Sequence, residues 1–253
     1  SNRVTGSLAL KGARIDDIVL SDYRQTVEED SDLIQLFSPS NTRFAYYAEH
    51  GWISAAGDVP VPTPETVWTT DRNTLTPETP VTLSWDNGQG LVFERRLAMD
   101  EDFMFTVTQT VRNTGDQRTT LYPYGLISRA GTPPVSGFFI LHEGLIGVLQ
   151  DTLVEHDYDD LQDEPRGTIE DTTTGGWIGI TDKYWLAAIA LAPDQRADTR
   201  FVHTLTNGRD RYQTDIRGGA FEVAPGAEVT FESRVFAGAK EVHLRISSPP
   251  TAW

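Results

Sequence analysis

The chain has 253 residues and a mass of 28.1 kDa, which suits one large all-β domain or two smaller domains and allows a sizeable core. Its 21 basic and 37 acidic residues give a net charge of −16, which would repel anionic lipid headgroups and argues against nucleic acid as a partner. The absence of cysteine excludes thiol chemistry, disulfides and cysteine-based zinc sites.

The most apolar stretch, residues 184–191, is far shorter than the roughly 20 residues that a membrane-spanning helix needs. The N-terminus shows no basic segment followed by an apolar one, as a signal peptide would. These two observations predict a soluble chain.

Alternating apolar and polar residues predict strands along most of the chain. Val81, Leu83 and Trp85 alternate with polar residues, and a second apolar group begins at Leu91. Between them, Asn87-Gly88 supplies the positive φ angles that a tight hairpin requires. The sequence therefore predicts a hairpin over residues 81–93.

A meander follows this hairpin. Residues 103–111 carry an inward face, and the turn at residues 113–116 leads into a strand at 119–124. The members of that face are Phe103, Phe105, Val107, Gln109 and Val111. Further strands are predicted at residues 177–181, 185–190, 200–205, 211–216, 220–223 and 228–236. Ten or more strands predict an all-β fold of two large packed antiparallel sheets.

Three stretches depart from the strand pattern. Residues 57–80 hold five prolines around Trp68 and predict an ordered loop over a sheet edge. Residues 151–171 are strongly acidic and predict an irregular segment. Residues 238–244 resemble the first turns of a short C-terminal helix, which the Ser-Ser-Pro-Pro sequence at 247–250 would end.

The acidic stretch carries nine carboxylates against one base, Arg166. A calcium loop is disfavoured, because residues 157–162 lack the glycine that such a loop has at its sixth position. A solvated loop or a patch that faces a partner is the better interpretation. The candidate partner-binding residues are Asp157, Asp159, Asp160, Asp163 and Glu164.

Histidines offer no persuasive catalytic or metal site. His142-Glu143 begins like a zinc-protease motif, but Ile146 stands where the second histidine would be needed. His156 and His203 are weaker candidates for acid–base chemistry, and their possible carboxylate partners are Glu143, Asp157 and Glu222. We assign no catalytic residue, no metal ligand and no cofactor.

Aromatic residues number 25, and most of them are expected in the core. Exposed aromatic rings on a concave sheet face would suit sugar rings or extended apolar peptides. The candidates for lining such a groove are Tyr46, Tyr47, Trp52, Trp68, Tyr122 and Tyr124.

Three segments resemble a known family. They are residues 6–18 (GSLALKGARIDDI), residues 175–188 (GGWIGITDKYWLAA) and residues 236–241 (FAGAKE). Together they are similar to the large periplasmic domain of the YidC membrane protein insertases of Gram-negative bacteria. The resemblance runs from about residue 3 to residue 244, and residues 175–188 are its most specific part.

The resemblance implies a β-supersandwich similar to galactose mutarotase-like domains. It implies a periplasmic domain over residues 1–244 that belongs to an inner-membrane protein and meets the membrane only through spans absent from this chain. The implied role is accessory and non-catalytic, with Sec translocon auxiliary subunits and nascent membrane-protein substrates as partners. Residues 245–253 depart from the family as a tail of uncertain structure.

Two other functions stay open. One is a carbohydrate- or peptide-binding sandwich that uses the aromatic groove. The other is an aldose 1-epimerase, which the shared fold type suggests, although fold similarity alone does not carry function.

Overall fold

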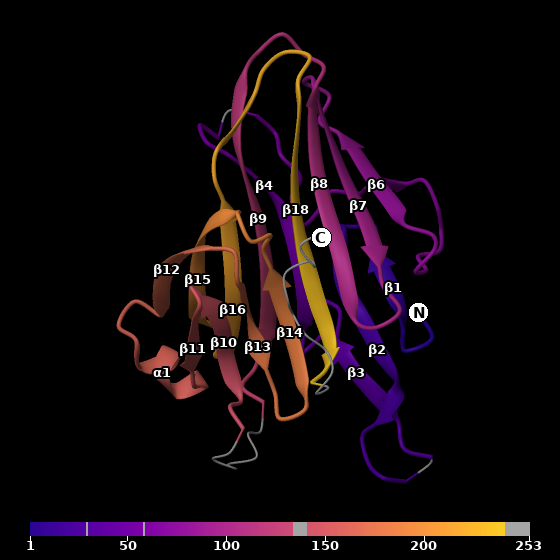
Figure 1. Ribbon diagram of the computed structural model, residues 1–253, viewed down its shortest axis with the longest axis vertical. Coiled ribbons are helices and arrows are strands. Elements are labelled where there is room, and N and C mark those ends of the chain that lie inside the picture. Colours follow the sequence, from indigo (N-terminus) through magenta and orange to yellow (C-terminus); the bar gives the residue numbers. More distant parts are fainter. Residues whose placement is uncertain (29, 58, 134–140, 241–253) are drawn as a thin grey trace, which may run out of the picture.

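A computed structural model of the chain describes residues 1–28, 30–57, 59–133 and 141–240, and nearly all of their regular structure is β-strand. The strands form two antiparallel sheets that pack face to face (Figure 1). The predicted all-β sandwich is confirmed. No helix among these residues is long and apolar enough to cross a membrane.

The first sheet has nine strands, which include the N-terminal strand and a strand from the middle of the sequence. Along its main path the order is β1-β2-β4-β9-β16-β15-β12, while β3 pairs with β2 and β17 pairs with β9. In chain order the strands are β1 (Val4–Ala9), β2 (Arg14–Arg24), β3 (Leu33–Phe37), β4 (Tyr46–Ser54), β9 (Thr119–Ala130), β12 (Thr168–Thr174), β15 (Arg196–Thr206), β16 (Arg209–Gly218) and β17 (Phe221–Val223).

The second sheet also has nine strands, in the order β11-β10-β13-β14-β18-β8-β7-β6-β5. Its strands are β5 (Thr69–Thr70), β6 (Val81–Asp86), β7 (Leu91–Met99), β8 (Met104–Asn113), β10 (Gly144–Leu149), β11 (Thr152–His156), β13 (Trp177–Thr181), β14 (Trp185–Ala190) and β18 (Glu228–Ala239). Figure 1 shows the last strand, β18, inside this sheet between β14 and β8.

The core lies between the sheets because each strand turns its apolar residues inward. The predicted hairpin is confirmed as β6 and β7, with Gly88 at a φ of 70° in its turn. The predicted inward face of the meander is also confirmed, since all five of its members, from Phe103 to Val111, are buried. Burial of this alternating face holds β7 and β8 in register.

The acidic stretch was expected to be irregular, and that expectation is wrong. Residues 151–171 contain β11, the helix α1 (Tyr158–Asp163) and the start of β12. Tyr158 and Leu161 lie three positions apart on one face of α1 and are buried, and the Tyr158 ring packs 4.5 Å from the Tyr212 ring. These two anchors hold an otherwise charged segment in regular structure.

The expected C-terminal helix does not begin at residue 238. Gly238 and Ala239 belong to β18, and both are buried. The Phe103 side chain occupies the space beside residue 238, where an added Cβ would lie 2.2 Å from a ring atom. Packing against this ring explains a glycine in the strand. The rest of the expected helix, and the tail at 245–253, lie outside the described residues.

One arginine crosses the core and joins the two sheets. Arg95 on β7 is only 2% exposed and donates a 2.6 Å hydrogen bond to the carbonyl oxygen of Ala13 at the start of β2. It also donates to the carbonyl oxygen of His50 on β4, and its guanidinium lies 5.0 Å from the centre of the Trp68 ring. Burial lowers the pKa of Arg95 to about 10, so the side chain remains charged at neutral pH.

His50 lies beside this arginine without charge. Burial lowers the pKa of His50 from 6.5 to about 3, and the positive charge of Arg95 contributes to the same shift. Its Nε2 atom is buried and has no hydrogen-bond partner among the described residues. The neutral ring is therefore a structural component of the core.

We expect Arg95→Met to lower the free energy of unfolding by about 3–5 kcal/mol, because it leaves buried carbonyl groups on the opposite sheet without a donor. Urea unfolding followed by tryptophan fluorescence measures this loss. Arg96→Met, at the exposed neighbouring position, is the matched control and should change the value by less than about 0.5 kcal/mol. Equal midpoints for the two variants would contradict the role of Arg95.

We expect the protein to lose about 2 kcal/mol of stability through His50 between pH 7.5 and pH 5. The folded-state pKa lies below the unfolded value of 6.5, so the unfolded chain binds more protons across this window and the free energy of unfolding falls as the pH falls. Urea titrations at several pH values measure the slope. His50→Gln should flatten it, and an unchanged slope would show that other groups cause it.

Candidate functional site

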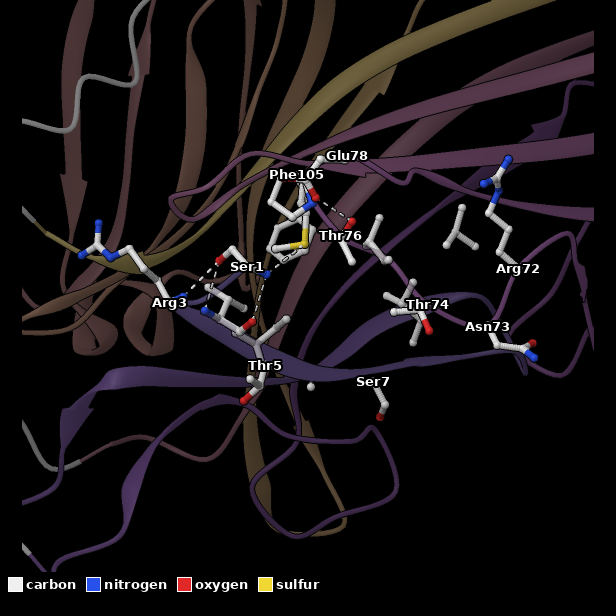
Figure 2. Close-up of a pocket in the computed structure, with 18 of the residues that line it drawn as sticks. Ser1, Arg3, Thr5, Ser7, Arg72, Asn73, Thr74, Thr76, Glu78 and Phe105 are labelled. Atoms are coloured by element: carbon white, nitrogen blue, oxygen red, sulfur yellow. Dashed lines mark hydrogen bonds between the residues drawn. The ribbon is translucent and has the colours of Figure 1, made fainter.

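A cavity lies at an open edge of the sandwich. It has a volume of about 950 Å³, within the range of ligand-binding sites. Figure 2 shows it between the N-terminal segment, which carries Thr5 and Ser7, and the segment from Arg72 to Glu78. Its apolar lining comes from both sheets and includes Val4, Leu8, Ile18, Leu83, Met99 and Phe105.

Two features of the chain create this opening. The segment between β4 and β6 runs over the edge as predicted, and its Trp68 is buried with a hydrogen bond from its backbone N–H to the carbonyl of Leu10. On the other side, Gly6 brings β1 so close to β2 that an added Cβ would lie 1.8 Å from the carbonyl oxygen of Asp17. The loop thus covers the edge of the sheet at residues 10–12 and leaves the edge uncovered along β1.

Several polar groups of the rim are already engaged. Arg3 forms 3.0 Å ion pairs with Asp22 and Asp102, and the Thr76 hydroxyl donates a 3.0 Å hydrogen bond to Glu78. None of the described groups with a shifted pKa lines the cavity. An apolar floor with paired charges at its rim suits binding rather than acid–base catalysis.

The predicted partner-binding carboxylates gather on and around α1. Asp157 precedes the helix, and its backbone N–H donates a 3.0 Å hydrogen bond to Asp160. The side chains of Asp157, Asp159, Asp160 and Asp163 are exposed, while Glu164 is half-buried. The structure therefore brings these residues together on one edge, and their role in binding stays a prediction.

The six aromatic candidates do not form one groove. Tyr46, Tyr47, Trp52 and Trp68 are buried, so their rings are core, while Tyr122 and Tyr124 are half-buried on β9. None of the six lines the large cavity. A groove that any of them lines stays a prediction.

Tyr124 and Glu49 belong to a compact polar cluster on the outer face of the first sheet. The Tyr124 hydroxyl donates a 3.0 Å hydrogen bond to Glu49, whose second carboxylate oxygen lies 2.6 Å from Arg14. Burial raises the pKa of Tyr124, and the Glu49 carboxylate raises it further. Each of these polar side chains has a hydrogen-bond or ion-pair partner within the cluster, which is typical of a structural network.

The histidines are scattered. His142 lies 3.3 Å from Asp157, and His203 lies 2.9 Å from Asp210. Neither histidine lines the large cavity, and no group of three His, Asp or Glu side chains among the described residues could hold a metal ion. The epimerase alternative, which needs an acid and a base facing a sugar, gains no support from these positions.

Sequence reasoning did not identify the cavity. Its walls come from residues 1–8 and 70–78, which are distant in sequence and neither strongly charged nor aromatic. The only hint of the cavity in the sequence was the proline-rich loop at residues 57–80, because an ordered loop over a sheet edge has to pack against that edge.

Comparisons with known proteins agree with the fold and with one family. The profile of the family described as YidC periplasmic domain matches residues 1–245. A protein from Methylorubrum extorquens named membrane protein insertase YidC is 48% identical over 246 residues, which cover 94% of this chain and 40% of that protein. A protein of the same name from Beijerinckia indica is 49% identical over 240 residues, covering 93% and 39%. The chain thus spans about 40% of the length of these curated relatives.

Solved structures resemble the sandwich at low identity. A galactose mutarotase-like protein from Lactobacillus casei superposes with a TM-score of 0.64 at 8% identity, covering 94% of this chain and 98% of that chain. A putative aldose 1-epimerase from Escherichia coli gives 0.52 at 10% identity, covering 93% and 96%. The expected mutarotase-like fold is confirmed, and at this identity the likeness shows the fold alone.

Proposed function

This chain belongs to the family of YidC periplasmic domains, and from that premise we propose that it is a non-catalytic binding module on the periplasmic side of a membrane protein insertase. In this proposal it holds extended apolar segments of membrane-protein substrates before they enter the bilayer. The observation that carries the proposal is the apolar cavity of about 950 Å³ beside β1.

The edge of β1 suits an extended ligand. β1 ends the first sheet and pairs only with β2 among the described strands. On its other edge Ser1 already bonds to the backbone N–H and C=O of Val4, and the backbone beyond Val4 is open to a ligand. An extended peptide can add to such an edge through main-chain hydrogen bonds that do not depend on its sequence. A module that serves many substrates needs this tolerance.

The floor of the cavity suits apolar side chains. Alternate residues of an added strand would point between the sheets, toward Leu83, Met99 and Phe105. Each buried apolar side chain of a ligand would contribute about 1.5–3 kcal/mol before the cost of ordering the ligand. Selectivity for apolar segments follows from this lining.

A blocking substitution tests the proposal. Thr74 is exposed and lines the cavity, so Thr74→Trp should fill the entrance without disturbing the core. We expect this variant to bind an extended peptide of alternating apolar residues at least tenfold more weakly than the native chain. Isothermal titration calorimetry with that peptide measures the difference.

The control is Thr152→Trp on β11, an exposed position at the opposite end of the second sheet. It should bind the peptide as the native chain does, and a polar peptide of equal length should not bind either protein. Equal affinities of the two tryptophan variants, or no binding at all, would rule out the cavity as the peptide site.

For Sec translocon auxiliary subunits, we propose the acidic residues around α1 as the contact surface. Asp159, Asp163 and their neighbours form an exposed negative edge that would steer a basic partner surface at low salt. The apolar anchors of α1 hold this edge in a fixed geometry, which an irregular loop would not provide.

Charge reversal distinguishes this contact from a general effect of net charge. We expect Asp159→Lys with Asp163→Lys to reduce recovery of Sec subunits from solubilised membranes at least fivefold at low salt. Asp116→Lys with Asp194→Lys makes the same change in net charge at exposed positions elsewhere, and recovery should persist. Quantitative mass spectrometry of the eluates measures both, and equal recovery would remove α1 as the contact.

A further inference from the structure

A second, smaller pocket concentrates positive charge in this acidic chain. It has a volume of about 310 Å³, and its walls are the turn before β4, the end of β9 and the hairpin between β15 and β16. Three arginines line it: Arg43, Arg209 and Arg211. It is separate from the cavity beside β1, with which it shares no lining residue.

These arginines are available to an anion. Arg14 and Arg200 form close ion pairs with carboxylates, whereas no carboxylate among the described residues pairs with the three pocket arginines. Arg211 donates a 3.3 Å hydrogen bond to the Tyr47 hydroxyl. Arg43 has its guanidinium carbon 5.2 Å from the centre of the Phe44 ring.

The acidic residue in the pocket is already occupied. Asp210 lies 2.9 Å from the His203 ring nitrogen and 3.5 Å from the Thr132 hydroxyl. Its carboxylate is therefore held by groups other than the three arginines, and the pocket keeps an excess of positive charge.

The walls of the pocket are joined by backbone hydrogen bonds. Ala130 donates to the carbonyl of Ala45, and Gly131 donates to that of Asp210, both at 2.8 Å. The hairpin turn is a two-residue Asn207-Gly208 turn with positive φ at both positions. The arginines thus project from segments with fixed positions, and an anion would find a preformed site.

One exposed apolar residue follows Arg43 directly, and another pairs with Asp210 at the end of β15. Phe44 follows Arg43 and is 67% exposed, and Leu205 on β15 is also 67% exposed. Neighbouring basic and apolar side chains are typical of surfaces that contact a bilayer interface, where the bases meet phosphates and the apolar groups enter the headgroup boundary. A site for a free, soluble anion would not need them.

We propose that this pocket binds the phosphate of an anionic lipid headgroup, with Phe44 and Leu205 entering the bilayer interface. The proposal rests on the placement of the chain at a membrane under the proposed function, but it does not depend on peptide binding. The net charge of −16 does not prevent such a contact, since charges farther than about 8 Å are largely screened at physiological ionic strength.

Vesicle sedimentation tests the proposal. We expect the native chain to bind vesicles that contain 30% phosphatidylglycerol in phosphatidylcholine, and not pure phosphatidylcholine. Because a basic side chain at an anionic surface contributes about fivefold, Arg43→Ala with Arg209→Ala should weaken binding by about tenfold to thirtyfold. Arg96→Ala with Arg166→Ala removes the same charge at exposed positions elsewhere and should change binding less than twofold.

Two further arms identify the source of the phosphate and separate this proposal from the previous one. Phe44→Ala with Leu205→Ala should weaken vesicle binding, and inorganic phosphate up to millimolar concentration should not replace it. The pocket variants should bind the apolar peptide as the native chain does. The proposal is overturned if phosphatidylglycerol vesicles do not bind, if both arginine pairs behave alike, or if inorganic phosphate binds while vesicles do not.

Discussion

The guanidinium of Arg95 sets the geometry on which the rest of the sandwich depends. A core of apolar residues fixes the separation of two sheets but not their lateral position, because apolar contacts are non-directional. Hydrogen bonds from Arg95 to the carbonyl groups of Ala13 and His50 are directional, and they fix β7 against β2 and β4. At the far side of the core, Arg129 on β9 and Asp182 beyond β13 form a 2.6 Å ion pair that also connects the sheets.

These two connections hold the middle of the sandwich together. Between them the inward faces are mostly apolar. Beyond Arg95, where β1 lies across from the segment before β6, the large cavity opens between the sheets, and Arg3 bridges its rim through ion pairs with Asp22 and Asp102. The peptide site that we propose thus lies beyond the Arg95 connection, at an edge of the sandwich.

The sequence predicts well what depends on neighbouring residues and poorly what depends on distant ones. The hairpin at Asn87-Gly88 and the inward face of β8 follow from local alternation, and both are confirmed. β11 and β12 escaped prediction because neither shows a sustained alternation of apolar and polar residues, and α1 escaped it because two anchors are a weak helical signal. Arg95 occupies an inward position between Phe93 and Leu97, but its carbonyl partners are 45 and 82 residues away. Arg43 and Arg209 line the same pocket only because β9 lies between the two segments that carry them.

The position of β18 constrains the order in which the domain can assemble. This strand is the last in the described chain, yet it pairs with β8 on one side and β14 on the other. A chain that emerges with its N-terminus first therefore cannot complete the second sheet until nearly all of it is free. Until then β8 and β14 expose unpaired backbone edges, which are prone to pairing with other chains. We therefore expect the second sheet to close late and the incomplete domain to be prone to aggregation.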